Sequence, residues 1–80
     1  MKLQKAVALR ISNLLIEHNM SRYALCKKVA MPEQTLKHII DERNKNIELA
    51  TIATIIEGFD MSLEEFFSDE LFAKNSYEVD

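Results

Sequence analysis

The chain has 80 residues, a hydrophobic fraction of 48% and a formal net charge of −3. A chain of this length forms one domain with a small core, and its single cysteine, Cys26, excludes an intrachain disulfide or a cysteine-rich zinc site. No apolar run approaches the roughly 20 residues of a membrane span, so we expect no membrane contact. One free cysteine favours a reducing compartment, the cytoplasm.

Apolar residues at helical spacing predict a first helix over about residues 3–18. Its inward stripe consists of Val7, Ile11, Leu14, Leu15 and His18. Asn19 tolerates a positive φ angle better than most residues, so it is expected to end this helix in the left-handed conformation. Ser21 is expected to cap a second helix over residues 22–29. The inner face of that helix consists of Leu25 and Val29.

A sharp corner follows, and it contains the only proline of the chain. Ala30 and Met31 form the predicted turn, and Pro32 fits the start of a third helix, where its missing N–H is not needed. We expect this helix to run to about residue 41. Its inward residues are Leu36, Ile39 and Ile40.

Two more helices follow a polar loop. Asn46 is expected to cap the fourth helix, and after a break at Asp60 and Met61 the pattern Ser62-Leu-Glu-Glu65 predicts a capping box for the fifth. The stripe of the fourth helix consists of Leu49, Ile52, Ile55, Ile56 and Phe59. These elements predict an all-α, compact five-helix domain over residues 1–73, followed by an acidic tail, 74–80, that we expect to be disordered.

The charges divide unevenly along the chain. Residues 1–45 contain nine Lys or Arg and four acidic residues, whereas residues 46–80 contain one lysine and nine acidic residues. A chain with this asymmetry can present a basic face to a polyanion even though its net charge is negative. Nucleic acid therefore remains a candidate partner.

The corner places the third helix where it can project from the domain. A major groove about 12 Å wide admits one helix, provided that the helix is apolar inside and able to hydrogen-bond outside. The outward side chains here are Glu33, Gln34, Lys37 and His38. Ser21 and Arg22 lie at the N-terminus of the preceding helix, which is suited to holding a phosphate. This arrangement predicts a helix-turn-helix DNA-binding domain.

The stretch SRYALCKKVAMPEQTLKHII, followed by ELATIATIIEGFDMSLEEFF, resembles the Cro/repressor-like, or XRE, family of helix-turn-helix domains. The resemblance covers about residues 7–68. It implies a homodimer that binds double-stranded DNA at a near-palindromic operator. It assigns base contacts to Glu33, Gln34, Lys37 and His38. The expected phosphate contacts are Ser21, Arg22, Arg43, Asn44 and Lys45.

Each residue on the groove face has a more specific expectation and an ordinary alternative. Gln34 can pair bidentately with adenine, Lys37 can reach guanine or a phosphate, and Glu33 can accept from cytosine N4 or repel the wrong base. His38 can contact a base or a phosphate. The alternative for all four is a solvated side chain on a helix surface.

The sequence departs from the family pattern at several positions. Ala30 replaces the usual turn glycine, which is tolerable only if its φ angle is negative or mildly strained. Asp60 replaces a second glycine with a residue that also tolerates the left-handed region. Many relatives pair an arginine with a glutamate at the positions of Leu15 and Ile40. Since both are apolar here, we predict that they touch.

An apolar cluster near the end of the domain is the candidate dimer interface. It consists of Phe66, Phe67, Leu71 and Phe72. These are more aromatic side chains than one small core needs, and an extra apolar patch often marks an interface. The alternative is that Phe72 folds back to cover the first helix.

The sequence therefore predicts a sequence-specific DNA-binding transcriptional regulator, and we expect a repressor. The alternative is a protein-interaction module on the same fold, such as an antitoxin, anti-repressor or adaptor, with its acidic C-terminal half against a protein partner. We expect no enzyme, metal or cofactor, because no catalytic constellation is evident and neither His18 nor His38 has a second ligand at metal spacing.

Overall fold

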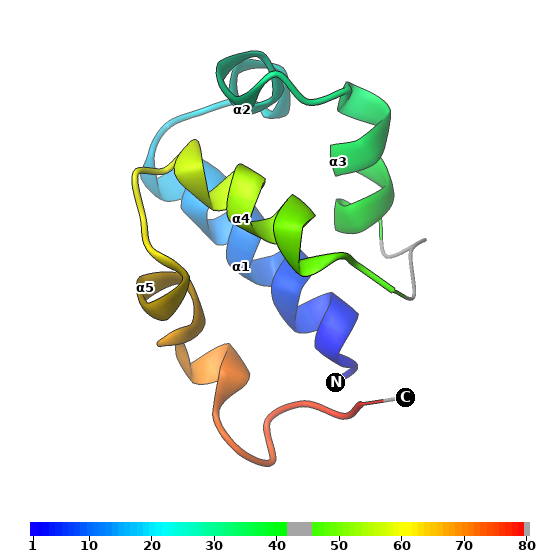
Figure 1. Ribbon diagram of the computed structural model, residues 1–80. Helices are drawn as coiled ribbons and strands as arrows, with labels where there is room; N and C mark the ends of the chain where they lie inside the picture. Colours follow the sequence, from blue (N-terminus) through cyan, green and yellow to red (C-terminus); the bar gives the residue numbers. More distant parts are fainter. Residues whose placement is uncertain (42–45, 80) are drawn as a thin grey trace.

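The computed structural model describes residues 1–41 and 46–79, and in these residues it contains five α-helices and one 3-10 turn (Figure 1). The elements are α1 (Leu3–Glu17), α2 (Arg22–Val29), α3 (Glu33–Ile40), α4 (Leu49–Glu57), α5 (Leu63–Phe67) and η1 (Glu70–Phe72). The predicted all-α five-helix fold is confirmed.

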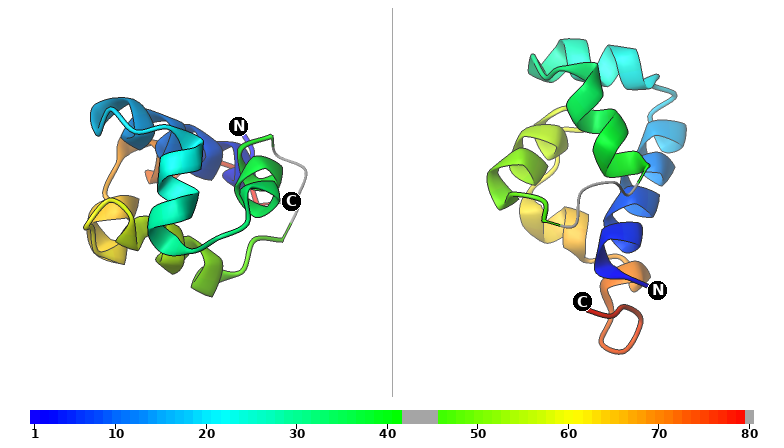
Figure 2. Two further views of the ribbon diagram at one scale, coloured as in Figure 1. Left: turned by 90° about the horizontal axis from the view of Figure 1, so that it is seen from above. Right: turned by 90° about the vertical axis from the view of Figure 1, so that its right-hand side faces the viewer.

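Helix α1 is the longest helix described, and other elements pack against it. It contacts α3 and η1, while α2 contacts both α3 and α4, and α4 contacts α5 (Figures 1 and 2). The hydrophobic core draws on every α-helix. It consists of Val7, Ile11, Leu14, Leu15, Leu25, Cys26, Leu36, Ile39, Ile52, Ile55, Ile56, Phe59 and Phe66. Burial of these side chains is the main favourable contribution to the free energy of folding. The described residues contain no disulfide that would add to it.

Three helices end in the same way. Asn19, Ala30 and Asp60 follow α1, α2 and α4, and all three adopt left-handed φ angles, at 51°, 55° and 55°. The expectations for Asn19 and Asp60 are confirmed. Ala30 adopts the strained conformation of the two that we considered. The strain arises because the Cβ atom of alanine disfavours this region, whereas glycine has no Cβ atom.

A methionine follows each of these left-handed residues. Its N–H donates to a carbonyl five residues earlier, which is the bond that defines a Schellman motif. The three bonds are Met20 to Leu15 at 2.9 Å, Met31 to Cys26 at 2.9 Å and Met61 to Ile56 at 3.4 Å. In each pair the carbonyl belongs to a core residue, and the methionine side chain packs against the core. The helix ends are therefore fastened by backbone bonds and by apolar contact.

Helix α4 begins later than the sequence predicts. Its N-cap is Glu48, with no capping bond from the side chain, so the expectation that Asn46 caps this helix is wrong. Leu49 is 63% exposed and does not belong to the inward stripe. Ile47, in the segment before the helix, packs against the core instead. Burial of Ile47 thus overrides the local capping signal.

His18 also departs from its predicted place in the inward stripe of α1. The helix ends at Glu17, and His18 is an exposed C-cap residue. Its ring lies 5.1 Å from the ring of Phe59, measured between centroids. Leu15, in contrast, is buried, and Ile40 packs against the core that contains it. Direct contact between Leu15 and Ile40 stays a prediction.

The segment after η1 runs back to the start of the chain. Glu78 donates its backbone N–H to the Met1 carbonyl at 2.7 Å and accepts from Leu3 N–H at 3.0 Å. The Lys2 ammonium lies 3.9 Å from the Glu78 carboxylate. In the segment for which we expected a disordered tail, Ser76 and Glu78 thus form backbone hydrogen bonds, and the chain up to residue 79 runs beside the start of α1 (Figure 1). Disorder of the tail stays a prediction.

Candidate nucleic-acid interface

Helices α2 and α3 form the predicted corner. Ser21 begins it as the N-cap of α2, because its hydroxyl accepts a hydrogen bond from the Ala24 N–H at 3.0 Å. Ala30 ends α2, and Pro32 occupies the N-cap of α3 with a φ angle of −61°. Local sequence thus sets both ends of the turn, and the mutual packing of α2 and α3 sets the angle between them.

Helix α3 divides into a buried and an exposed face. Leu36 and Ile39 are each 1% exposed and pack into the core, on the side where α3 contacts α1. Glu33, Gln34 and Lys37 are exposed. The helix crosses the outside of the domain, and Figure 2 (right) shows it facing the viewer with no other segment over it. The structure therefore brings these three side chains together on one accessible surface.

His38, the fourth candidate for a base contact, is half-buried. Its Nε2 atom lies 2.8 Å from the amide nitrogen of Gln34, one helical turn earlier. An amide nitrogen has no free lone pair, so Gln34 donates and the imidazole Nε2 accepts. This arrangement of the two nitrogens corresponds to the imidazole tautomer with its proton on Nδ1.

The candidate phosphate contacts are only partly described. Arg22 is exposed at the N-terminus of α2, next to Ser21, whose hydroxyl also caps the helix. The other three candidates, Arg43, Asn44 and Lys45, lie outside the described residues. The exposed Arg22 side chain is free to reach a polyanion that approaches this end of α2.

Sequence reasoning missed the residue that fixes α2 against α4. A Cβ atom on Gly58 would overlap the Leu25 Cδ1 atom and lie 3.1 Å from Val29 Cγ1, so any larger residue here would require the Leu25 side chain to shift. The Lys28 ammonium also donates to the Gly58 carbonyl at 3.0 Å. The available signal was the position of the only glycine at the end of a strongly apolar helix.

The candidate dimer residues gather around η1. Phe66 is fully buried, whereas Phe67, Leu71 and Phe72 are half-buried. The three phenylalanine rings form one cluster, with centroid distances of 4.9, 4.8 and 5.8 Å. Phe72 therefore packs back onto its own domain, in a turn that contacts α1. A partner could reach the outer parts of this cluster but not Phe66.

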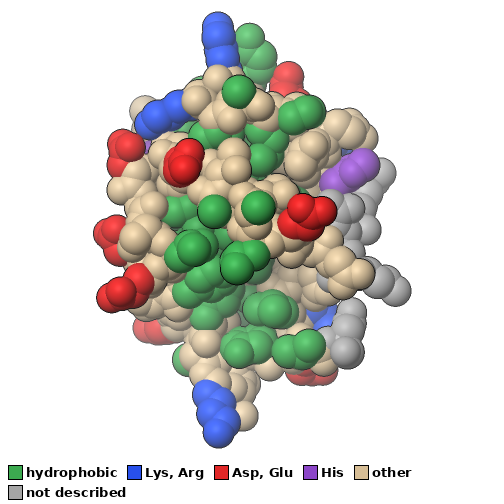
Figure 3. Space-filling view, viewed as in Figure 1, with side chains coloured by type: hydrophobic (Ala, Val, Ile, Leu, Met, Phe, Trp, Pro, Cys, Tyr) green, Lys and Arg blue, Asp and Glu red, His purple; other side chains and the backbone are tan. Residues whose placement is uncertain are grey.

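The surface of the domain on the side seen in Figure 1 has both hydrophobic and acidic regions. On the face seen in Figure 3, hydrophobic side chains gather over its middle and lower part, and acidic side chains line its left edge. The exposed large hydrophobic residues of α4 and α5 are Leu49 and Leu63. In the part of the chain that the structure describes, no helix is both long and apolar enough to cross a membrane.

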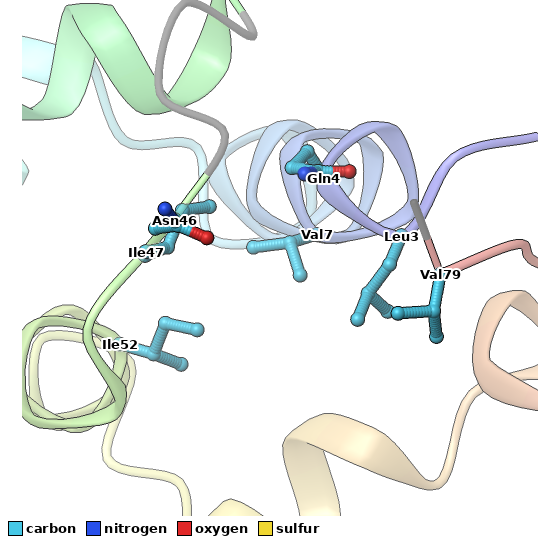
Figure 4. Close-up of a pocket in the computed structure, with 7 residues that line it drawn as sticks. All are labelled: Leu3, Gln4, Val7, Asn46, Ile47, Ile52 and Val79. Atoms are coloured by element: carbon cyan, nitrogen blue, oxygen red, sulfur yellow. The ribbon is translucent and has the colours of Figure 1, made fainter.

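The pocket in Figure 4 has a volume of about 310 Å³ and lies between the start of α1 and the segment before α4. Its lining residues are Leu3, Gln4, Val7, Asn46, Ile47, Ile52 and Val79. None of them is titratable, and the described residues contain no group of His, Cys, Asp or Glu side chains able to hold a metal ion. The pocket therefore offers apolar surface and two amides, with no group for acid-base chemistry.

Comparison with protein families agrees with this geometry. Residues 10–71 match the family model of the Cro/C1-type helix-turn-helix DNA-binding domain, and this range contains α2 to α5 and the second half of α1. Comparisons with curated proteins and with solved structures gave no match. The match covers most of the chain, so the chain belongs to the Cro/C1-type helix-turn-helix DNA-binding family.

Proposed function

We propose that the protein is a sequence-specific transcriptional regulator, and a repressor, that reads the major groove of an operator with α3. The observation that carries the proposal is the division of α3 into a buried face and an exposed face in a domain of this family. A domain bound in this way occupies its operator and excludes other proteins from it. The protein would work in the cytoplasm by binding rather than by catalysis.

Some of the proposed contacts would specify the DNA sequence, and the others would position the protein on the duplex. Gln34 would pair with adenine, and Lys37 with guanine or a nearby phosphate. Arg22 would bind a phosphate from the N-terminus of α2. The expected partners in the polar loop are Arg43, Asn44 and Lys45. Phosphate contacts would make the affinity fall with salt, whereas base contacts would set the preferred sequence.

A homodimer would place two copies of α3 in successive turns of the groove, with half-sites about 34–36 Å apart. We propose that the outer parts of Phe67, Leu71 and Phe72 contribute to the dimer surface, with Phe66 supporting them from below. Leu71→Asp tests this surface, because Leu71 lies outside the ring cluster and is half-buried. Sedimentation should show a monomer with unchanged circular dichroism. A dimer that persists in this variant would remove the surface from the proposal.

The function is tested by binding to random-sequence duplex DNA over a range of salt concentrations, followed by selection of the bound sequences. We expect log affinity to fall against log salt with a slope of about −0.9 for each phosphate contacted, and a two-fold-symmetric selected site. Gln34→Ala and Lys37→Ala should each relax one position of that site. Lys74→Ala is a matched control for Lys37→Ala, because it removes the same charge from the segment after η1.

The second candidate function is a protein-interaction module, favoured by the acidic C-terminal half. Its exposed carboxylates on α4 and α5 include Glu57, Glu64 and Glu65. If no DNA binding appears even at low salt, the regulator proposal fails. The acidic surface would then be the place to look for a basic protein partner.

A further inference from the structure

We propose that His38 is a positioning residue that orients the amide of Gln34 for reading adenine, and that it makes no base contact of its own. The proposal rests on the proposed function, since it concerns how α3 would read DNA. Its starting point is the 2.8 Å distance between Gln34 Nε2 and His38 Nε2 on the face of α3 that is open to solvent.

The chemistry of a primary amide explains why this bond leaves Gln34 able to read a base. The amide NH₂ group has two hydrogens, and only one of them points outward beside the carbonyl oxygen Oε1. Adenine is read by that outward N–H together with Oε1, which pair with adenine N7 and N6. The other hydrogen points back along the side chain. It is the one suited to donate to an acceptor on the same helix, and His38 Nε2 is such an acceptor.

The bond also fixes which side of the amide carries the oxygen. Because Nε2 of Gln34 faces His38, Oε1 lies on the side away from it. The tautomer of His38 therefore decides the order of donor and acceptor that Gln34 presents. With the imidazole proton on Nδ1, the amide nitrogen must face the ring. With the proton on Nε2, the amide would turn over and present the opposite order.

His38 is the better fixed of the two residues. Its side chain is half-buried, whereas that of Gln34 is exposed. An exposed glutamine samples many rotamers, and ordering it on binding costs conformational entropy. A partner that is already held on the same helix, four residues away, lowers that cost before DNA arrives. His38 would thus raise affinity and base discrimination through Gln34.

The test begins with the base pair whose selection Gln34→Ala relaxes. A bidentate contact corresponds to roughly tenfold to hundredfold discrimination. We expect His38→Ala to lower discrimination several-fold at that same pair and at no other. In the Gln34→Ala background, His38→Ala should cause no further loss. His18→Ala is the matched control, because it removes the other histidine of the chain from α1's C-cap, away from α3.

Two binding results would overturn the proposal while leaving the proposed function intact. In one, His38→Ala relaxes a different base pair, which would make His38 a base contact. In the other, His38→Ala lowers discrimination by the same factor whether or not Gln34 is present, which would show that His38 does not act through Gln34. A wild-type protein that selects no sequence would overturn both this proposal and the proposed function. Circular dichroism of each variant checks that α3 remains folded.

A measurement on the free protein gives a readout that a purely structural role would not change. Proton–nitrogen correlation spectra of the imidazoles at alkaline pH report which ring nitrogen carries the proton. We expect the Nδ1–H tautomer for His38, and a shifted Gln34 side-chain amide signal that moves in His38→Ala. An Nε2–H tautomer in His38, or a Gln34 amide unaffected by His38→Ala, would refute the proposed orientation.

Discussion

The guanidinium of Arg10 donates from Nε to the backbone carbonyl of Phe66 at 2.9 Å, across 56 residues of sequence. The same group donates from Nη2 to the Glu65 carbonyl at 3.1 Å, and its Nη1 lies 3.3 Å from Asp69 Oδ2. Both carbonyls belong to the last turn of the five-residue helix α5, where carbonyls lack the usual partner further along the helix. The Glu65 carbonyl also accepts from the N–H and the hydroxyl of Ser68, at 3.4 and 2.9 Å. A side chain of α1 therefore caps α5 from outside.

Replacing Arg10 should loosen α5 and η1 from the rest of the domain. Arg10→Met keeps much of the apolar stem and removes the hydrogen bonds to Phe66, Glu65 and Asp69, so we expect a loss of about 2 kcal/mol in the free energy of unfolding. Urea denaturation measures it. Asp69→Asn is the control: it keeps the Oδ1 that caps η1 and removes only the charge, so it should cost less. Equal losses in the two variants would contradict a capping role for Arg10.

Replacing alanine by glycine should have opposite effects on stability at Ala30, which is left-handed, and at Ala24, which is helical. Ala30→Gly should raise stability by about 1 kcal/mol, because glycine adopts this conformation without the strain of a Cβ atom. For a domain of this size, that corresponds to a rise of about 4–8 °C in melting temperature. Ala24→Gly, the same substitution inside α2, should lower stability by roughly 0.5–1 kcal/mol. Thermal melts in which both variants shift in the same direction would contradict this account.

Gly58→Ala tests the close approach of α2 and α4. The backbone at Gly58 is right-handed, so alanine suits its conformation and the expected cost is purely steric. Leu25 is fully buried, so its side chain must repack within the core to admit the new Cβ, and we expect a loss of about 1–3 kcal/mol. Because α2 carries α3, DNA affinity should fall as well. Glu57→Ala, at the neighbouring position, is the control, because it adds no atoms and should leave the fold intact. If Gly58→Ala were as stable as the wild type, α2 and α4 would be able to move apart freely.

Cys26 gives the pH dependence of stability. Burial raises the pKa of its thiol, and the negative charge of Glu33 raises this pKa further. A thiol whose folded pKa exceeds its unfolded value stabilises the fold below the unfolded pKa, and this contribution is lost as the pH rises through the folded one. The free energy of unfolding should therefore fall above about pH 8.5. Cys26→Ala should lack this part of the fall, and parallel curves for the two proteins in urea titrations would refute it.

Four helix ends follow from local signals that the sequence contains. Ser21 and Ser62 cap their helices through hydrogen bonds to residues three positions away, so the pattern contains the whole interaction. Asn19 and Asp60 likewise end helices through their own backbone preference. The division of α3 into two faces is also local, because it follows from helical periodicity alone.

Interactions between distant segments are what the sequence conceals. Arg10 looks like a polar interruption of an apolar stripe, and nothing near it reveals a role as the cap of α5. The start of α4 is misplaced because Ile47 gains more from burial than Asn46 would from capping. Within the candidate site, the pairing of Gln34 with His38 is visible as a spacing of four residues, but the atoms that meet depend on side-chain rotamers.

The pairing of the two chain ends has a consequence for the order of folding. The bonds between Glu78 and the Met1–Leu3 segment close a loop that contains almost the whole chain, and closing a long loop costs more entropy than closing a short one. Local helices and the α2–α3 corner can form before this closure. The amide of Glu78 should therefore exchange its hydrogen early in the native state, through an opening that leaves α3 undisturbed.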